Sequence, residues 1–229
     1  MFIVGELING MYANIALAIK NRDIAEVQKC ALQQVACGAE ALDINCGPVS
    51  QNQNTDMRWL VETIQEVTDK PLCLDSSSPK AIEEGLKASR NKTIINSTTA
   101  DIEKLDILVP LAKKYNSKLI GITISTKGIP QNKEQRVELA AKIIANITEQ
   151  GFPVEDLYLD PIVLPINVAQ EQMTDILESI HEFKIISNPS AKTIFGLSNV
   201  SQGTHTHSLI NRTFLTMAIA YGLDSAILN

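Results

Sequence analysis

The stretch from residue 193 to 201 reads Thr193-Ile194-Phe195-Gly196-Leu197-Ser198-Asn199-Val200-Ser201. Apolar and β-favouring residues lead up to the glycine, and polar residues follow it. This pattern predicts a buried strand whose carboxyl end opens onto solvent or a ligand. Other short apolar segments also finish in an acid or an amide, at Asn45, Asp75, Asn96 and Asp160. The repetition indicates one shared polar rim.

Strand-like and helix-like segments alternate along the whole chain. The predicted strands are 2–8, 41–45, 71–75, 93–98, 118–125, 157–164, 193–201 and 225–229. Because helical segments separate all of them, the sheet should be parallel with helices outside it. Eight such units predict an α/β fold of the (β/α)8 TIM-barrel type, formed as one domain by residues 1–229. A doubly wound open sheet is the alternative, although it usually has fewer strands.

The alternation supplies seven helices, and the last predicted strand is also the last segment of the sequence. We therefore expect a barrel that lacks its eighth helix in this chain. Polar caps open the predicted helices at Asp23, Ser78 and Asn132, and Gly38 suits a left-handed helix end. Pro110 should either kink its helix or mark the start of that helix.

Composition excludes several classes of function. Hydrophobic residues make up 45% of the 229 residues, which is ample for a large core, and the formal net charge is −6. That charge argues against nucleic acid as the main partner. The start of the sequence shows neither a basic leader nor a membrane-spanning run, so we expect a cytoplasmic protein without a membrane partner. The four cysteines lack metal-site spacing and are predicted to be reduced, buried thiols.

Active sites of TIM barrels lie where the strands end. This places Asp75, Asn96, Asp160 and Asn199 around one predicted site, with Asn9 and Asn45 beside them. Acids and amides with hardly any cation favour a neutral ligand rich in hydrogen-bond donors. The segment 201–205 contains one glycine and no lysine or arginine, which argues against a phosphate site there. The alternative for any single strand-end aspartate is a cap on the following helix.

Four short patterns carry a family resemblance: Leu74-Asp75-Ser76, Ile95-Asn96-Ser97-Thr98, Tyr158-Leu159-Asp160-Pro161 and the stretch from Gly196 to Ser201. With them the chain resembles the pterin-binding barrel superfamily. More specifically, it resembles the methyltetrahydrofolate:corrinoid/iron–sulfur protein methyltransferases of the acetyl-CoA pathway. The resemblance runs over essentially the whole chain, from Gly5 to Phe214.

The resemblance implies transfer of the N5-methyl group of 5-methyltetrahydrofolate to the Co(I) centre of a corrinoid. The corrinoid, a cobalamin-type cofactor, would be carried by a corrinoid iron–sulfur protein or another carrier, and the enzyme would be a homodimer without a tightly bound metal. It implies Asn199 as the catalytic residue, near N5. The substrate-binding residues would be Asp75, Asn96, Asp160, Gly196, Ser198 and Gln202. Gln202 and Gly203 would also face the corrinoid.

One position departs from the family pattern. Where the family has a basic residue that meets the folate tail, this chain has His207, within Thr204-His205-Thr206-His207. We interpret this His-x-His as an exposed loop rather than a metal site, since no third ligand is evident.

Two alternative functions stay open. A dihydropteroate synthase-like enzyme shares the barrel, but it would call for a lysine on the seventh strand and a basic end to the eighth. A non-catalytic pterin-binding barrel is the second alternative.

Overall fold

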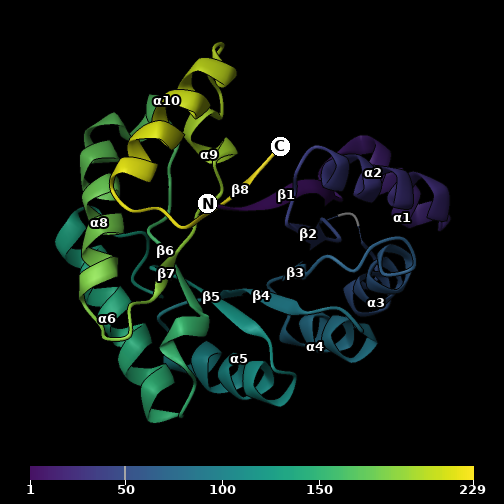
Figure 1. Ribbon diagram of the computed structural model, residues 1–229, viewed down its shortest axis with the longest axis horizontal. Coiled ribbons are helices and arrows are strands. Elements are labelled where there is room, and N and C mark those ends of the chain that lie inside the picture. The colour runs from purple at the N-terminus through teal and green to yellow at the C-terminus, as the bar shows by residue number, and fades with distance from the viewer. Residues whose placement is uncertain (49) are drawn as a thin grey trace. The chain divides into compact units, whose positions relative to one another are not determined.

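The computed structural model describes residues 1–48 and 50–229. Its eight strands form one sheet in the order β7-β6-β5-β4-β3-β2-β1-β8, with helices between successive strands (Figure 1). This confirms the predicted α/β fold of the TIM-barrel class. The chain divides into two compact units. The N-terminal unit comprises Ile3–Ser97, Leu111–Lys118 and Asn229, and the C-terminal unit comprises Met1–Phe2, Thr98–Pro110 and Leu119–Leu228. The prediction of a single domain stays a prediction.

The first elements in chain order are β1 (Phe2–Asn9), α1 (Ala13–Asn21), α2 (Ile24–Ala36), β2 (Ala41–Asn45), α3 (Gln53–Ile64), β3 (Leu72–Asp75), α4 (Pro79–Ala88) and β4 (Thr93–Thr98). The later elements are α5 (Ile102–Lys114), β5 (Lys118–Ile122), α6 (Lys133–Glu149), β6 (Leu157–Asp160), α7 (Ile166–Ala169), α8 (Met173–Ile185), β7 (Lys192–Thr193), α9 (Ser198–Ser201), α10 (His207–Ala220) and β8 (Ser225–Leu228). Two single-turn 3₁₀ helices, η1 (Val154–Asp156) and η2 (Gln170–Gln172), complete the order.

Several predicted boundaries are wrong. The seventh strand is much shorter than 193–201, because Leu197 adopts helical angles and residues Ser198–Ser201 form the short helix α9. The sixth strand ends at Asp160, where Pro161 cannot donate a ladder hydrogen bond. Pro110 lies inside α5 and does not begin it. Helices α1 and α7 were not predicted. The signal for α1 was present, since Ile15, Ala18 and Ile19 are buried at helical spacing, whereas α7 is only 4 residues long.

The predicted helix caps are confirmed. The side chains of Asp23, Ser78 and Asn132 accept hydrogen bonds from Glu26 N, Ala81 N and Gln135 N, respectively. Gly38 has a φ of 102°, the left-handed conformation that favours glycine. Local sequence signals therefore set where these helices begin and end.

In the N-terminal unit, β2, β3 and β4 separate an apolar face from a polar one. Leu42 pairs with Leu72, and Ile44 pairs with Leu74, and all four side chains are fully buried. Leu74 lies against α3 and α4, because a Cβ added at Gly85 would meet Met57 Cγ at 2.9 Å and Leu74 Cδ1 at 3.0 Å. Successive side chains of a strand alternate, so Asp43, Cys73 and their neighbours two residues away face away from these helices.

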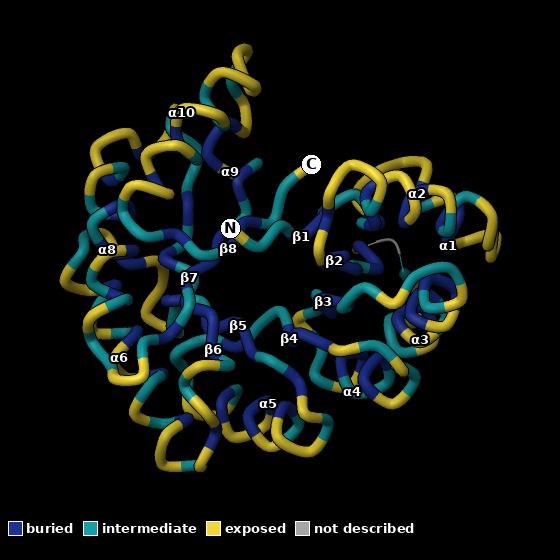
Figure 2. The backbone as a smooth tube through the Cα atoms, in the orientation of Figure 1, coloured by how far each residue is buried: buried dark blue, intermediate teal, exposed yellow. Residues whose placement is uncertain are grey.

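The C-terminal unit has its own apolar core between its strands and the helices α8 and α10. Phe195 stacks at a tilt on Phe214 of α10, with ring centroids 5.5 Å apart, and both are buried. A Cβ at Gly121 of β5 would meet Ile143 of α6 at 3.1 Å, so this strand and helix pack closely. Figure 2 shows the same division in each unit, with buried strands and exposed outer faces on the helices.

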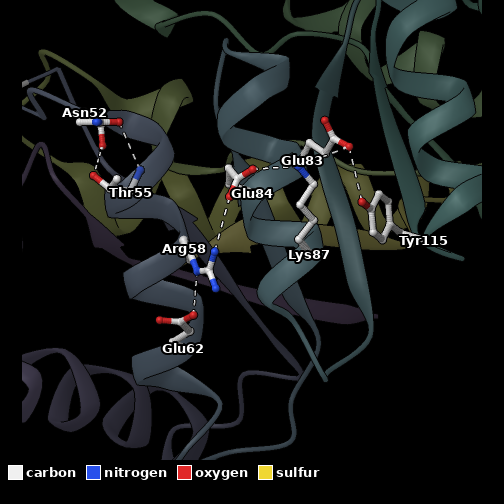
Figure 3. A network of polar contacts seen from close by, with 8 residues as sticks. All are labelled: Asn52, Thr55, Arg58, Glu62, Glu83, Glu84, Lys87 and Tyr115. Carbon is white, nitrogen blue, oxygen red and sulfur yellow. Dashed lines mark hydrogen bonds and ion pairs between the residues drawn. The ribbon is translucent and has the colours of Figure 1, made fainter.

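The outer surfaces of α3 and α4 carry a network of charged side chains (Figure 3). Arg58 of α3 bonds Glu62 at 2.9 Å and reaches Glu84 of α4 at 3.9 Å, and Lys87 bonds Glu84 at 2.9 Å. Exposed pairs of this kind contribute little to stability, because water and salt screen their charges. The network helps to orient α4 on α3, while the stability comes from the apolar face beneath.

Within the described residues, no helix combines the length and the apolar character needed to cross a membrane.

Gly10 and Gly47 lie in close backbone contact at the ends of β1 and β2. A Cβ at Gly10 would meet the Cys46 carbonyl oxygen at 2.2 Å, whereas a Cβ at Gly38 would meet nothing within 4 Å. Gly10→Ala should therefore destabilise the protein by about 1–3 kcal/mol, the usual cost of overpacking. Gly38→Ala is the control, with only the backbone cost of a left-handed alanine, about 1–2 kcal/mol. Urea unfolding measures both, and a loss below about 1 kcal/mol in Gly10→Ala would contradict the contact.

Candidate active site

The N-terminal unit gathers acids and amides on one face of its sheet. Asp43 pairs in register with Cys73, Asn45 with Asp75, and Asp75 with Asn96. Since paired residues of neighbouring parallel strands point the same way, all five side chains share the face opposite Leu74. The structure thus brings together the predicted site residues Asp75, the last residue of β3, and Asn96, two residues before the end of β4.

We call the face formed by Asp43, Asn45, Cys73, Asp75 and Asn96 the acid–amide face. Each of its two carboxylates accepts a hydrogen bond from a neighbouring side-chain amide. Asn45 Nδ2 donates to Asp75 Oδ2 over 2.7 Å, and Asn96 Nδ2 donates to Asp43 Oδ1 over 3.1 Å. The side-chain Oδ1 of Asn45 accepts a hydrogen bond from Gly47 N over 2.7 Å, which fixes the orientation of that side-chain amide. Because both NH₂ groups point at carboxylates, these asparagines present an oriented set of groups rather than freely rotating ones.

Burial changes the acidity of this face. Asp43 is only 3% exposed. Burial and the neighbouring Asp75 carboxylate raise its pKa well above the ordinary aspartate value, while hydrogen bonds from Asn96 and Cys73 act in the opposite direction. Burial also raises the pKa of Asp75, against the hydrogen bond from Asn45. Two carboxyl groups that share a dry site cannot both ionise easily, so together they retain a proton to higher pH than isolated aspartates would.

Cys73 belongs to the same arrangement. Its pKa is raised well above the ordinary thiol value by burial and by Asp43, to which it is hydrogen-bonded. The protonated thiol therefore acts as a donor toward Asp43 and is not a nucleophile. As predicted, the thiols are free, and Cys30, Cys46 and Cys73 are buried, but Cys37 is exposed and corrects that part of the prediction.

In the C-terminal unit, Asp160 is the last residue of β6. It is paired with Ile122, and its backbone carbonyl accepts from both Thr123 N and Thr123 Oγ1 over 2.9 Å. Its Oδ1 accepts from Ile162 N over 2.7 Å. Burial raises the pKa of Asp160 to about 7, although the Ile162 N–H favours the ionised form. Asp160 can thus accept hydrogen bonds as a carboxylate or retain a proton near neutral pH.

The segment from Gly196 to Gly203 follows the seventh strand in the same unit. Phe195 and Leu197 exchange backbone hydrogen bonds with Ile227 of β8, so the chain stays paired up to Leu197 and then turns into α9. Asn199 is exposed on α9, and a Cβ at Gly196 would lie 3.2 Å from Asn199 Nδ2. Glycine at 196 therefore gives the Asn199 amide room to fold back over the strand end.

The remaining predicted residues lie beside α9. Gln202 and Gly203 are exposed, and Ser198 is half-buried. His207, predicted to lie in an exposed loop, is exposed but begins α10, and its Nδ1 lies 3.1 Å from Ser201 Oγ. Among the described residues, no cluster of three or more His, Cys, Asp or Glu side chains is arranged to hold a metal ion.

Sequence reasoning missed Asp43 and Cys73 as members of the acid–amide face. The signal was present, since Asp43 precedes Asn45 by two residues and Cys73 precedes Asp75 by two. Residues two apart on a strand share a face. The strand-end residues drew the prediction because they sit where ligands bind, whereas Asp43 and Cys73 lie one step deeper in the sheet.

The sequence profile of the family described as "Pterin binding enzyme" matches residues 15–229. The chain is 26% identical over 231 residues to a methylcorrinoid:tetrahydrofolate methyltransferase from Eubacterium limosum, covering all of this chain and 85% of that protein. It is 28% identical over 245 residues to a methionine synthase from Mycobacterium leprae. That match also covers all of this chain but only 20% of the synthase.

Among solved structures, the chain is similar to a dihydropteroate synthase from Coxiella burnetii in complex with pteroic acid. The TM-score is 0.72 at 15% sequence identity, and the match covers 99% of this chain and 86% of the other. At this identity the likeness supports the fold and not the activity.

Asp43 should make stability depend on pH. Its pKa is raised in the folded protein, so the folded state binds more protons than the unfolded state above about pH 4. The free energy of unfolding contributed by Asp43 therefore falls as pH rises from about 4 to the raised pKa. Relative to wild type, Asp43→Asn should gain stability between pH 4 and pH 8, as measured by urea unfolding. The exposed Asp69→Asn serves as the control. A constant difference between Asp43→Asn and wild type across that range would contradict the raised pKa.

Proposed function

The chain belongs to the pterin-binding enzyme family, and from that premise we propose that it transfers the N5-methyl group of 5-methyltetrahydrofolate to the Co(I) centre of a corrinoid protein. The observation that carries the proposal is the similarity to a methylcorrinoid:tetrahydrofolate methyltransferase over the full length of this chain. The name of that relative describes transfer from a methylcorrinoid to tetrahydrofolate, which is the reverse of the reaction proposed here. The cobalt and N5 exchange the methyl group in either direction.

We propose that Asp75, Asn96 and Asp160 bind the pterin ring. A pterin presents an amino group and ring N–H groups along one edge, and carboxylates accept such donors in charge-assisted hydrogen bonds. The acid–amide face supports this role, because Asp75 is held by Asn45 at the carboxyl end of its strand. Asp43 and Cys73 would act beneath the ligand, by orienting Asn96 and by keeping a proton within the face.

The methyl transfer sets a clear chemical demand. The lone pair of Co(I) attacks the methyl carbon, the N5–carbon bond breaks, and N5 keeps that bonding pair. N5 then needs a proton or a strong hydrogen bond, because an unprotonated nitrogen anion is a poor leaving group. We propose that the amide N–H of Asn199 donates to N5 as charge develops, and that Asp160 supplies the proton through water. A pKa of about 7 suits Asp160 for that task.

The acceptor in this proposal is carried by a second protein, a corrinoid iron–sulfur protein or another corrinoid carrier. Gln202 and Gly203 would face it, and their exposure beside α9 is compatible with contact to a large, flat cofactor. The homodimer, the cytoplasmic location and the acetyl-CoA pathway stay predictions.

The experiment that tests the function mixes the protein with 5-methyltetrahydrofolate and free cob(I)alamin and follows the corrinoid spectrum. Conversion of the Co(I) spectrum to that of methylcobalamin, dependent on the protein, is the expected result. Tight pterin binding without conversion would favour a non-catalytic pterin-binding barrel. Condensation of a pterin diphosphate with 4-aminobenzoate instead would favour a dihydropteroate synthase-like enzyme.

Replacing Asp160 should weaken pterin binding. Leaving a ring N–H without its charged acceptor costs about 1.5–3 kcal/mol, so Asp160→Ala should raise the Kd for methyltetrahydrofolate at least tenfold by calorimetry. The wild-type Kd should also fall as pH rises through about 7, because the carboxylate is the better acceptor. Glu138→Ala, a change in an exposed carboxylate of α6, is the control. Equal affinity in Asp160→Ala and wild type would place the pterin elsewhere.

Replacing Asn199 should affect the rate more than binding. By analogy with the loss of an oxyanion-hole donor, Asn199→Ala should cost about 3 kcal/mol, or roughly two orders of magnitude in the single-turnover rate. Pterin affinity should fall much less, since the hydrogen bond strengthens mainly as the N5–carbon bond breaks. Stopped-flow traces at saturating methyltetrahydrofolate measure the rate. A near wild-type rate would leave Asn199 without a catalytic role.

A further inference from the structure

Arg136 of α6 is a fully buried cation, with 0% of its surface exposed. Its guanidinium donates three hydrogen bonds: Nε to the Pro161 carbonyl over 2.9 Å, Nη1 to the Asn132 carbonyl over 3.1 Å, and Nη2 to Gln172 Oε1 over 2.9 Å. All three acceptors are neutral. Burial lowers the pKa of Arg136, and the charged group that opposes this effect is Asp175 of α8. Burying a guanidinium in this way is costly, so its contacts call for a reason beyond packing.

One of those contacts leads directly to Asp160. The peptide unit between Pro161 and Ile162 has its carbonyl bound by Arg136 Nε and its N–H bound to Asp160 Oδ1, at 2.9 and 2.7 Å. A planar peptide unit cannot turn one of these groups without turning the other. The guanidinium therefore determines where the hydrogen-bond donor to the Asp160 carboxylate points.

This peptide unit would not keep its orientation unaided. Ile162 has a φ of 61°, in the left-handed region that a β-branched residue rarely adopts. Left alone, the backbone at Ile162 would relax toward negative φ, and its N–H would turn away from Asp160. The bond from Arg136 to the Pro161 carbonyl opposes that relaxation, and Gln172 and Asn132 hold the guanidinium in place.

We propose that Arg136 is a positioning residue for Asp160, holding the Pro161–Ile162 peptide unit so that its N–H stabilises the Asp160 carboxylate. The inference rests on the proposed function only for what Asp160 then does with a pterin. The charged side chain of α6 packed against this loop is Arg136 itself, and Asp175 faces the guanidinium from α8. The proposal predicts that removing Arg136 alters the ionisation of Asp160 without direct contact between the two side chains.

A purely structural role is the competing explanation, because Arg136 also links α6 to Gln172 at the start of α8. Lys133 offers a matched control for that role. It lies on the same helix, is also a cation, and bonds Glu178 of α8 over 2.9 Å, but its ammonium group binds α8 and not the Pro161–Ile162 peptide unit. Arg136→Met and Lys133→Met each remove one cation between α6 and α8, and only the first removes the hold on the peptide unit.

The test titrates the Asp160 carboxyl by ¹³C NMR, with labelled aspartate and assignment through Asp160→Asn. Loss of a hydrogen bond to a carboxylate changes its ionisation equilibrium about tenfold, so Arg136→Met should raise the Asp160 midpoint by about one pH unit. Lys133→Met should leave the midpoint at the wild-type value. An unchanged midpoint in folded Arg136→Met overturns the proposal. If that variant does not fold, Gln172→Met decides, with a smaller shift in the same direction expected and no shift overturning the proposal.

A second pair of variants separates positioning from general loosening. Glycine adopts positive φ at little cost, so Ile162→Gly removes the strain that Arg136 opposes. The midpoint shift caused by Arg136→Met should therefore be less than half as large in the Ile162→Gly background. Equal shifts in both backgrounds would mean that Arg136 does not act through this peptide unit, and would overturn the proposal.

The titration uses no ligand, so it decides the role of Arg136 whether or not the proposed function holds. A separate calorimetric arm measures methyltetrahydrofolate binding. If wild type binds, Arg136→Met should weaken binding at neutral pH severalfold, and higher pH should restore part of the loss. Failure of wild type to bind would count against the proposed function alone.

Discussion

A strand presents only every second side chain to a given face. In β2, β3 and β4 this alternation places apolar side chains on one face and acids and amides on the other. One set, Leu42, Ile44, Leu72 and Leu74, is fully buried, and Leu74 is seen to pack on the helices. The other set carries Asp43, Asn45, Asp75 and Asn96. A shift of one residue would exchange the two sets, burying acids against the helices and turning leucines toward the opposite face. The apolar face thus fixes the register on which the polar face depends.

Carboxyl groups of both units are buried in surroundings that disfavour their charge. The two units differ in the kind of hydrogen-bond donor that offsets this effect. In the N-terminal unit, side-chain donors stabilise the acids: Asn45 bonds Asp75, and Asn96 bonds Asp43. In the C-terminal unit, the donor to Asp160 is a backbone N–H, which lies in a strained turn. A side-chain amide can be supplied by one residue, whereas a strained peptide needs an external hold. The buried Arg136 meets that need, because its rigid guanidinium binds the adjoining carbonyl while Asn132 and Gln172 fix its plane.

This difference in donors affects the pKa values on which the proposed methyl transfer depends. A carboxylate that binds a ligand N–H and also carries a proton must have a pKa near the working pH. Burial alone would push Asp160 toward the neutral acid, and the Ile162 N–H offsets that effect. In the N-terminal unit, burial raises the pKa of both Asp43 and Asp75, and the Asp75 carboxylate raises the pKa of Asp43 further, which suits retention of a proton. The hydrogen-bond donors around each aspartate therefore lead to different acidities in Asp160 and in the Asp43–Asp75 pair.

The sequence by itself determined the fold class, the caps at Asp23, Ser78 and Asn132, and the strand-end positions of Asp75, Asn96 and Asp160. These follow from periodicity and from residues that act within a few positions along the chain. The sequence also held the signal that places Asp43 and Cys73 on the acid–amide face, since each lies two residues before a predicted strand end. The tertiary structure alone decided that residues 198–201 leave the strand as α9, and that Arg136 reaches the loop after β6. Each of these depends on contacts across strands or helices, as when Arg136 meets Pro161 from 25 residues away. Local patterns carry no record of such partners, because the energy that selects them arises only once the strands and helices have packed.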